Sequence, residues 1–120
     1  MNALWLAWFQ GVFYVVAGLW PLIHMRSFEA ISGLKIDHWL VNTVGLLISV
    51  TGAICIFSAV RGVLPPETIL LAVGNALALA GIDMFYATRG RISKVYLIDS
   101  VVELVLVGLW IIPLIETLSL

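Results

Sequence analysis

Four apolar stretches, each close to the length of a membrane-spanning helix, constrain this chain more than any other feature. They cover roughly residues 3–23, 39–60, 68–87 and 95–115. A helix needs about 20 mostly apolar residues to cross a hydrocarbon core about 30 Å thick. Because little of the 120-residue chain lies outside these stretches, we predict an all-α membrane protein. Residues 1–120 should form one domain, an antiparallel four-helix transmembrane bundle.

The composition points to the same class and excludes others. The chain is 62% hydrophobic and 11% charged, whereas soluble domains are about 45–50% apolar and about 25% charged. It has no Gly-x-Ser-x-Gly elbow, no Cys–His pair and no phosphate-cradling glycine loop, so we do not expect nucleophilic catalysis, and we expect no nucleic acid as a partner. The single cysteine, Cys55, cannot form an internal disulfide and is expected to be a small buried hydrophobe.

The basic residues predict how the bundle is oriented. Five of the six Lys and Arg residues fall in two connections, residues 24–38 and 88–94. Short loops rich in Lys and Arg stay in the cytoplasm. We therefore expect both loops to be cytoplasmic and both termini to lie on the outer side. Within the first loop, Phe28, Ile31 and Leu34 recur every third residue, which predicts a short interfacial helix that Gly33 ends.

Each apolar stretch carries one face of polar or small residues, and we expect these faces to point into the bundle. The four faces are Gln10, Tyr14, Ala17, Pro21 and His24; His38, Asn42, Gly45, Ser49 and Gly52; Ala72, Ala76, Ala80 and Asp83; and Tyr96, Asp99 and Glu103. The alanine-rich third stretch, which also holds Gly74 and Ala78, is predicted to be the most closely packed helix.

The polar groups concentrate around residues 83–103, toward the cytoplasmic half. The candidate ligand-binding residues are Tyr14, His24, His38, Asn42, Asp83, Tyr86, Tyr96, Asp99 and Glu103. An ionisable side chain at membrane depth costs several kcal/mol unless it is paired, hydrated or protonated. Glu103 is the strongest functional candidate because no loop cation shares its depth, and Asp83 and Asp99 are the other candidates for catalysis.

Two alternatives assign these carboxyls other roles. In a structural role, Asp83 and Asp99 would pair with basic residues of the 88–94 hairpin, namely Arg89, Arg91 and Lys94. Glu103 would then be a protonated acid hydrogen-bonded to Asn42, Tyr14 or Ser49. In a metal site, two His and three carboxyls would be the ligands. Di-metal bundles usually carry a Glu-x-x-His pair within one helix, and none occurs here, so we expect no metal and no cofactor.

These groups suit three functions. We favour a small integral membrane protein that binds a hydrophobic or amphipathic ligand, such as a lipid, or a partner membrane protein, through a polar cavity in the cytoplasmic half. It would lie in the bilayer alone or as a homodimer. The first alternative is a membrane-embedded acid–base enzyme, isomerase-like, acting on a lipid. The second is a proton-coupled transporter, although small four-helix drug exporters carry their essential Glu in the first helix and this chain has none there.

Three segments carry a resemblance to a known group of proteins. They are Ser27-Phe28-Glu29-Ala30 with Lys35, His38-Trp39-Leu40-Val41, and Tyr96-Leu97-Ile98-Asp99 with Glu103. In these segments and in its overall layout, the chain resembles small, uncharacterised four-helix proteins of the bacterial inner membrane. The resemblance implies a location in the bacterial inner membrane and assigns no catalytic residue.

Overall fold

The structure, a computed structural model, describes residues 3–119, which form five α-helices and no strand. They are α1 (Leu4–Ile23), α2 (Met25–Ser32), α3 (His38–Arg61), α4 (Pro66–Thr88) and α5 (Val95–Leu118). The helices α1, α3, α4 and α5 coincide with the four predicted stretches, and each is long and apolar enough to cross a membrane. The molecule is 47 Å long, close to the ~40–45 Å of a bilayer with its headgroup regions.

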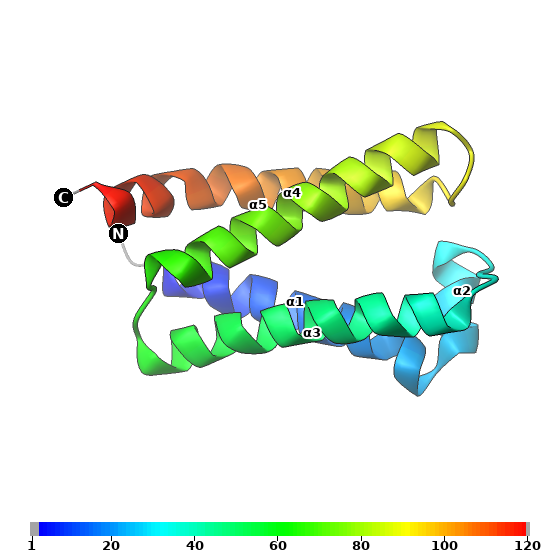
Figure 1. The fold of residues 1–120 in the computed structure, drawn as a ribbon, viewed down its shortest axis with the longest axis horizontal. Coiled ribbons are helices and arrows are strands. Elements are labelled where there is room, and N and C mark those ends of the chain that lie inside the picture. Colours follow the sequence, from blue (N-terminus) through cyan, green and yellow to red (C-terminus); the bar gives the residue numbers. More distant parts are fainter. Residues whose placement is uncertain (1–2, 120) are drawn as a thin grey trace.

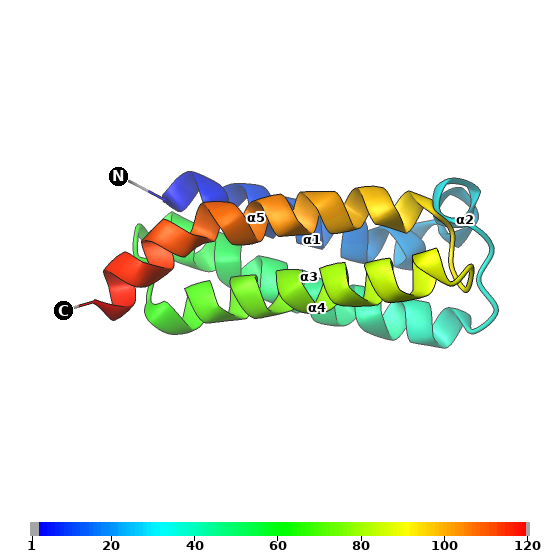
Figure 2. The ribbon, with the colours of Figure 1, turned by 90° about the horizontal axis from the view of Figure 1, so that it is seen from above.

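Local sequence signals mark the ends of the long helices. Pro66 opens α4 and Glu67 lies in its first turn, where a carboxylate favours the positive end of the helix dipole. Asp37 stands at the N-cap of α3, but its side chain makes no capping hydrogen bond. Pro113, a residue type that ends or kinks helices, does not end α5, which continues through it to Leu118, and the ribbon of α5 bends near that end (Figure 2).

The short helix predicted in the first loop is present as α2. The Nδ1 atom of His24 accepts a hydrogen bond of 3.1 Å from the backbone N–H of Ser27, which caps the start of the helix. Gly33 ends it with a φ of 98°, a conformation that residues with a Cβ rarely adopt. His24 is therefore not part of the polar face of α1 but the junction between α1 and α2.

The long helices are arranged as two pairs, which Figure 1 shows one above the other. One pair is α1 with α3 and the other is α4 with α5. Both ends of the described chain lie at one end of the molecule and α2 lies at the other, where the two pairs diverge (Figure 1). The apolar core lies at the end with the termini and includes Leu6, Cys55, Ile69, Leu106 and Trp110.

The closest helix contact is between α1 and α3 and depends on glycine. Gly11 faces Gly52, and seven residues further along α1, Gly18 faces Gly45, so the two helices run in opposite directions. A Cβ added to Gly11 would lie 2.8 Å from the carbonyl oxygen of Gly52. A Cβ added to Gly18 would overlap the carbonyl oxygen of Gly45. The prediction that the third stretch packs most closely is therefore wrong.

The alanines of α4 explain that error. Ala72, Ala76 and Ala80 are buried as expected, whereas Gly74 and Ala78 are exposed. A Cβ added to Gly74 would meet nothing within 4 Å. Small residues permit close approach, but they do not decide which face of a helix a neighbour covers.

Candidate functional site

A first set of polar contacts joins the two helix pairs through Gln10 of α1, in the half of the molecule that holds the termini. The side-chain amide of Gln10 donates a hydrogen bond of 3.0 Å to the carbonyl oxygen of Ala72 in α4. Its Oε1 accepts a hydrogen bond of 2.8 Å from the indole N–H of Trp110 in α5. Gln10 and Trp110 are fully buried. Because both ends of the Gln10 amide are bonded, this contact fixes α1 against α4 and α5 without leaving an unsatisfied group.

One turn further toward α2, Tyr14 and Glu103 form the second contact between the pairs. The Tyr14 hydroxyl donates a hydrogen bond of 2.7 Å to Oε1 of Glu103, and both residues are about 1% exposed. Of the three partners that the sequence offered for Glu103, the structure selects Tyr14. Ser49 instead donates to the carbonyl oxygen of Gly45 in its own helix, and Oδ1 of Asn42 is buried without a hydrogen bond.

Asp83 of α4 and Asp99 of α5 complete a carboxyl cluster, which we define as Asp83, Asp99 and Glu103. The Asp99 carboxyl is close enough to interact with both Asp83 and Glu103. Asp83 is 4% exposed, and its Oδ2 is a buried atom with no hydrogen-bond partner, whereas Asp99 is half-buried. Three acidic groups therefore meet between α4, α5 and α1 in the half of the molecule that contains α2.

The basic residues of the hairpin do not neutralise this cluster. The Arg89 guanidinium lies over the Phe85 ring, 3.8 Å from its centroid, and within residues 3–119 the single ion pair joins Glu29 to His38. The predicted pairing of Asp83 and Asp99 with Arg89, Arg91 or Lys94 is thus not found in the described part of the chain. An acidic cluster without a basic partner must hold protons or accept donors from a ligand.

The remaining predicted residues lie beside the 88–94 hairpin and around α2. Tyr86 and Tyr96 are half-buried on either side of the hairpin, and the Lys35 ammonium lies 5.1 Å from the centroid of the Tyr96 ring. His24 and His38 are exposed and make their side-chain contacts around α2. Among residues 3–119, no group of three or more His, Cys, Asp or Glu side chains is placed to hold a metal ion.

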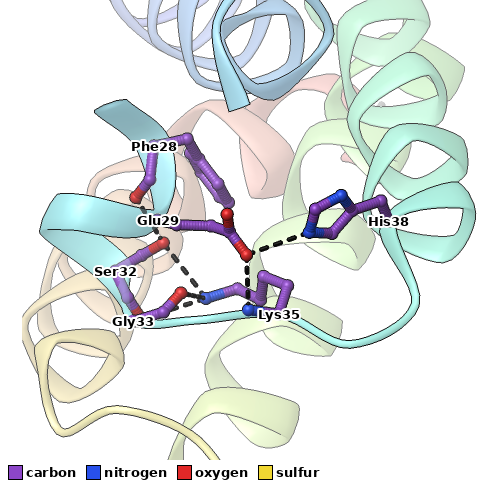
Figure 3. A network of polar contacts seen from close by, with 6 residues as sticks. All are labelled: Phe28, Glu29, Ser32, Gly33, Lys35 and His38. Atoms are coloured by element: carbon purple, nitrogen blue, oxygen red, sulfur yellow. Dashed lines mark hydrogen bonds and ion pairs between the residues drawn. The ribbon is translucent and has the colours of Figure 1, made fainter. Parts of the chain in front are cut away.

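A second polar network, which the sequence reasoning missed, joins α2 to the start of α3 (Figure 3). Oε2 of Glu29 accepts a hydrogen bond of 2.7 Å from the backbone N–H of Lys35 and lies 3.0 Å from Nε2 of His38. The Lys35 ammonium donates to the carbonyl oxygens of Ser32 and Gly33, at 3.0 and 2.6 Å. The sequence signal for this network was the order of its residues, Glu29, Gly33, Lys35 and His38. The positive φ of Gly33 turns the chain back, so that Lys35 and His38 reach the Glu29 carboxylate.

The Glu29 network predicts a response to acid. The Lys35 backbone N–H first, and the His38 ring second, hold the pKa of Glu29 below its usual range. A carboxyl whose pKa is lower in the folded than in the unfolded state stabilises the folded state at pH values above the unfolded pKa, which is ~4.3 for Glu. The contribution is lost as the pH falls through the lower, folded value. In micelles, the NMR shift of the Lys35 amide should titrate with a midpoint below ~4.3.

Two variants check the assignment of that titration. Glu29→Gln keeps an oxygen that accepts from the Lys35 amide but removes the charge, so the titration of that amide should disappear. Glu67→Gln removes an exposed carboxyl at the opposite end of the molecule and should leave it unchanged. A Lys35 titration that persists in Glu29→Gln would show that another group controls the segment.

Three surface hollows of the described chain are lined by residues outside the carboxyl cluster. One of about 660 Å³ lies beside α2, one of about 730 Å³ runs along the tryptophans of α1, and one of about 290 Å³ lies near the termini. Asp83 and Glu103 are buried between the helices, whereas Asp99 is half-buried.

The fold and the contacts define a class: a helical protein whose four long helices can cross a membrane and whose two helix pairs enclose an acidic cluster. Comparison of the chain with protein-family models, with curated proteins and with solved structures finds no match. The functional argument therefore depends on the geometry of the described residues.

Proposed function

We propose that the protein is a multi-pass protein of the bacterial inner membrane and that its long helices form an antiparallel transmembrane bundle. Both termini lie on the outer side, and residues 24–38 and 88–94 face the cytoplasm. Five of the six basic residues belong to these two loops, which supports this orientation. Large apolar side chains such as Ile54, Leu77 and Val105 cover the outward faces of α3, α4 and α5, as contact with lipid requires.

Within this bundle, the protein binds an amphipathic small molecule at the carboxyl cluster. The ligand has an apolar part, which packs between the helices, and a polar group that donates hydrogen bonds to the three carboxyls of the cluster. The observation that carries this proposal is Oδ2 of Asp83, a buried carboxyl oxygen with no donor. Leaving such an atom unsatisfied in an apolar environment is costly, and a donor from a ligand removes that cost.

The arrangement of the helix pairs supports a ligand that enters from the cytoplasmic half. The core that joins the pairs lies at the opposite end, and the pairs diverge toward α2 (Figure 1). The cluster lies between these regions, with the Tyr14–Glu103 hydrogen bond on the side of the core. A partner membrane protein would instead contact the outward faces of the bundle. Asp83 and Glu103 are buried away from those faces, so the small ligand is favoured.

Glu103→Gln tests the proposal directly. Gln keeps the size of the side chain and accepts the Tyr14 hydrogen bond, so we expect the helix content and the melting temperature to change little. Gln replaces one acceptor oxygen of the carboxyl with an N–H donor, so a hydrogen bond from the ligand is lost and ligand retention should fall by about tenfold, the usual effect of removing one such bond. Native mass spectrometry of protein extracted in mild detergent measures retention of co-purified molecules and reports the oligomeric state at the same time.

Glu116→Gln is the matched control, because Glu116 is an exposed carboxyl on the same helix. It should retain the same molecules as the unmodified chain. If Glu103→Gln also retains every one of them to the same extent, Glu103 has no role in binding and the proposal fails.

A proton-coupled transporter is the second candidate, and the two-pair architecture favours it. The glycine contacts hold α1 and α3 together as a unit, and the cluster lies where this unit meets α4 and α5. Alternating access commonly moves one such unit against another around a fixed site. Ligand-driven proton movement in reconstituted vesicles distinguishes this function from binding alone, which does not require it.

A further inference from the structure

We propose that the hollow beside α2 is a binding site for the headgroup of an aminophospholipid, one that carries both a phosphate and a primary ammonium group. The hollow has a volume of about 660 Å³ and is lined by Met25, Arg26, Glu29, Ala30, Gly33, Leu34 and His38. It lies at the opposite end of the molecule from the termini (Figure 1). The site shares no residue with the carboxyl cluster.

The cation in this hollow is free to bind a phosphate. Arg26 is exposed and makes no hydrogen bond, ion pair or ring contact with residues 3–119. Lys35, the other cation of this loop, already donates to Ser32 and Gly33 and lies over two aromatic rings. Arginine presents several donors in one plane, a geometry that matches the oxygens of a phosphate.

The anion in the hollow is held in place with one oxygen unused. Oε2 of Glu29 takes the Lys35 N–H and faces the His38 ring, as Figure 3 shows, whereas Oε1 accepts no hydrogen bond from the described residues. The same donors keep the pKa of Glu29 below its usual range, so this carboxylate remains charged at neutral pH. A fixed carboxylate oxygen beside a free guanidinium complements a headgroup that carries both charges.

The surroundings of the hollow place it against a bilayer rather than in bulk water. Leu34 and Ile36 are 91% and 97% exposed, and two large aliphatic side chains on one turn of chain suit burial in the headgroup and acyl region. The acyl chains of the lipid would follow these residues. This is why we assign the site to a membrane lipid and not to a soluble phosphate ester.

The chemistry predicts a ranking of lipids. Phosphatidylethanolamine supplies the phosphate for Arg26 and an ammonium N–H for Glu29. Phosphatidylcholine carries a quaternary ammonium, which has no N–H to donate, and phosphatidylglycerol has no positive charge. For the full chain in mild detergent, native mass spectrometry with these three lipids, matched in acyl chains, should show phosphatidylethanolamine retained at least several-fold better than the other two.

Variants separate the two charges of the site. Arg26→Ala removes no hydrogen bond, ion pair or ring contact with residues 3–119, so the fold should persist while retention of phosphatidylethanolamine falls by about tenfold or more. Glu29→Gln removes the carboxylate that accepts the ammonium N–H, so phosphatidylethanolamine should no longer be retained better than phosphatidylcholine. Arg61→Ala, at the end of α3, and Glu67→Gln, at the start of α4, are the controls and should behave as the unmodified chain. The connection between α3 and α4 lies at the other end of the molecule (Figure 1).

Three outcomes would overturn the assignment. In the first, the three lipids bind the unmodified chain equally. In the second, Arg26→Ala and Arg61→Ala show the same retention. In the third, glycerophosphoethanolamine, which has the headgroup but no acyl chains, displaces the lipid at equal concentration, which would identify a soluble ligand. None of these outcomes bears on Glu103, so the ligand proposed for the carboxyl cluster stands or fails separately.

Discussion

Gly18→Ala is expected to destabilise the protein by about 2–3 kcal/mol, the upper part of the range for overpacking a well-packed contact. The new methyl group would overlap the carbonyl oxygen of Gly45 and the side chain of Ser49. Neither helix backbone can move aside locally, so α1 and α3 must separate along their length. The higher helix propensity of Ala, about 1 kcal/mol relative to Gly, offsets only part of this cost.

Gly74→Ala is the matched control for that prediction. Gly74 also lies inside a long helix, but a Cβ there meets nothing within 4 Å. The same substitution should therefore leave the free energy of unfolding unchanged or raise it by up to about 1 kcal/mol. Reversible unfolding in mixed micelles measures both variants. Equal changes in the two would mean that Gly18 and Gly45 do not form a close contact.

The sequence was sufficient to predict where the long helices lie, because hydropathy and length both report on the hydrocarbon core. Predicted and observed bounds differ by at most three residues, at the C-terminal end of α5, where Pro113 is accommodated inside the helix. The short helix α2 was also predictable, since its apolar spacing and Gly33 are local signals. These elements depend on neighbouring residues alone.

Helix pairing was not predictable in the same way. In a membrane, lipid and helix interior are both apolar, so an apolar or small face does not reveal which of them it meets. Gly74 and Ala78 of α4 are small residues like Gly11 and Gly18 of α1. Gly74 and Ala78 are nevertheless exposed, whereas Gly11 and Gly18 face a partner helix. The information that distinguishes them lies in the contact between two helices, not in either helix.

The carboxyl cluster illustrates the same limit for the site. Helical spacing correctly placed Asp99 and Glu103 on one face of α5, and depth indicated that Glu103 has no basic neighbour. The sequence could not identify Tyr14, rather than Asn42 or Ser49, as the partner of Glu103, because the choice depends on the register between α1 and α5. It also placed His24 and His38 with the carboxyls, whereas both contact α2 and the loop beside it.

The register between helices also determines which buried polar groups are satisfied, and this leads to the second large effect. Asp83→Val is expected to raise the free energy of unfolding of the ligand-free protein by about 1–3 kcal/mol, the usual cost of a buried polar group without a hydrogen bond. Valine has nearly the volume of aspartate, and it removes both the unpartnered Oδ2 and the interaction of Asp83 with Asp99.

Gln10→Leu is a comparable change, from a buried polar to an aliphatic side chain, and the opposite sign is expected for it. It leaves the Trp110 indole N–H without its acceptor, which should cost about 1–3 kcal/mol. A stabilised Asp83→Val that no longer retains the co-purified ligand would identify Asp83 as a group that serves binding at the expense of stability. If Asp83→Val instead destabilises the protein as much as Gln10→Leu, neighbouring groups already satisfy Asp83, and the carboxyl cluster is a structural feature rather than a binding site.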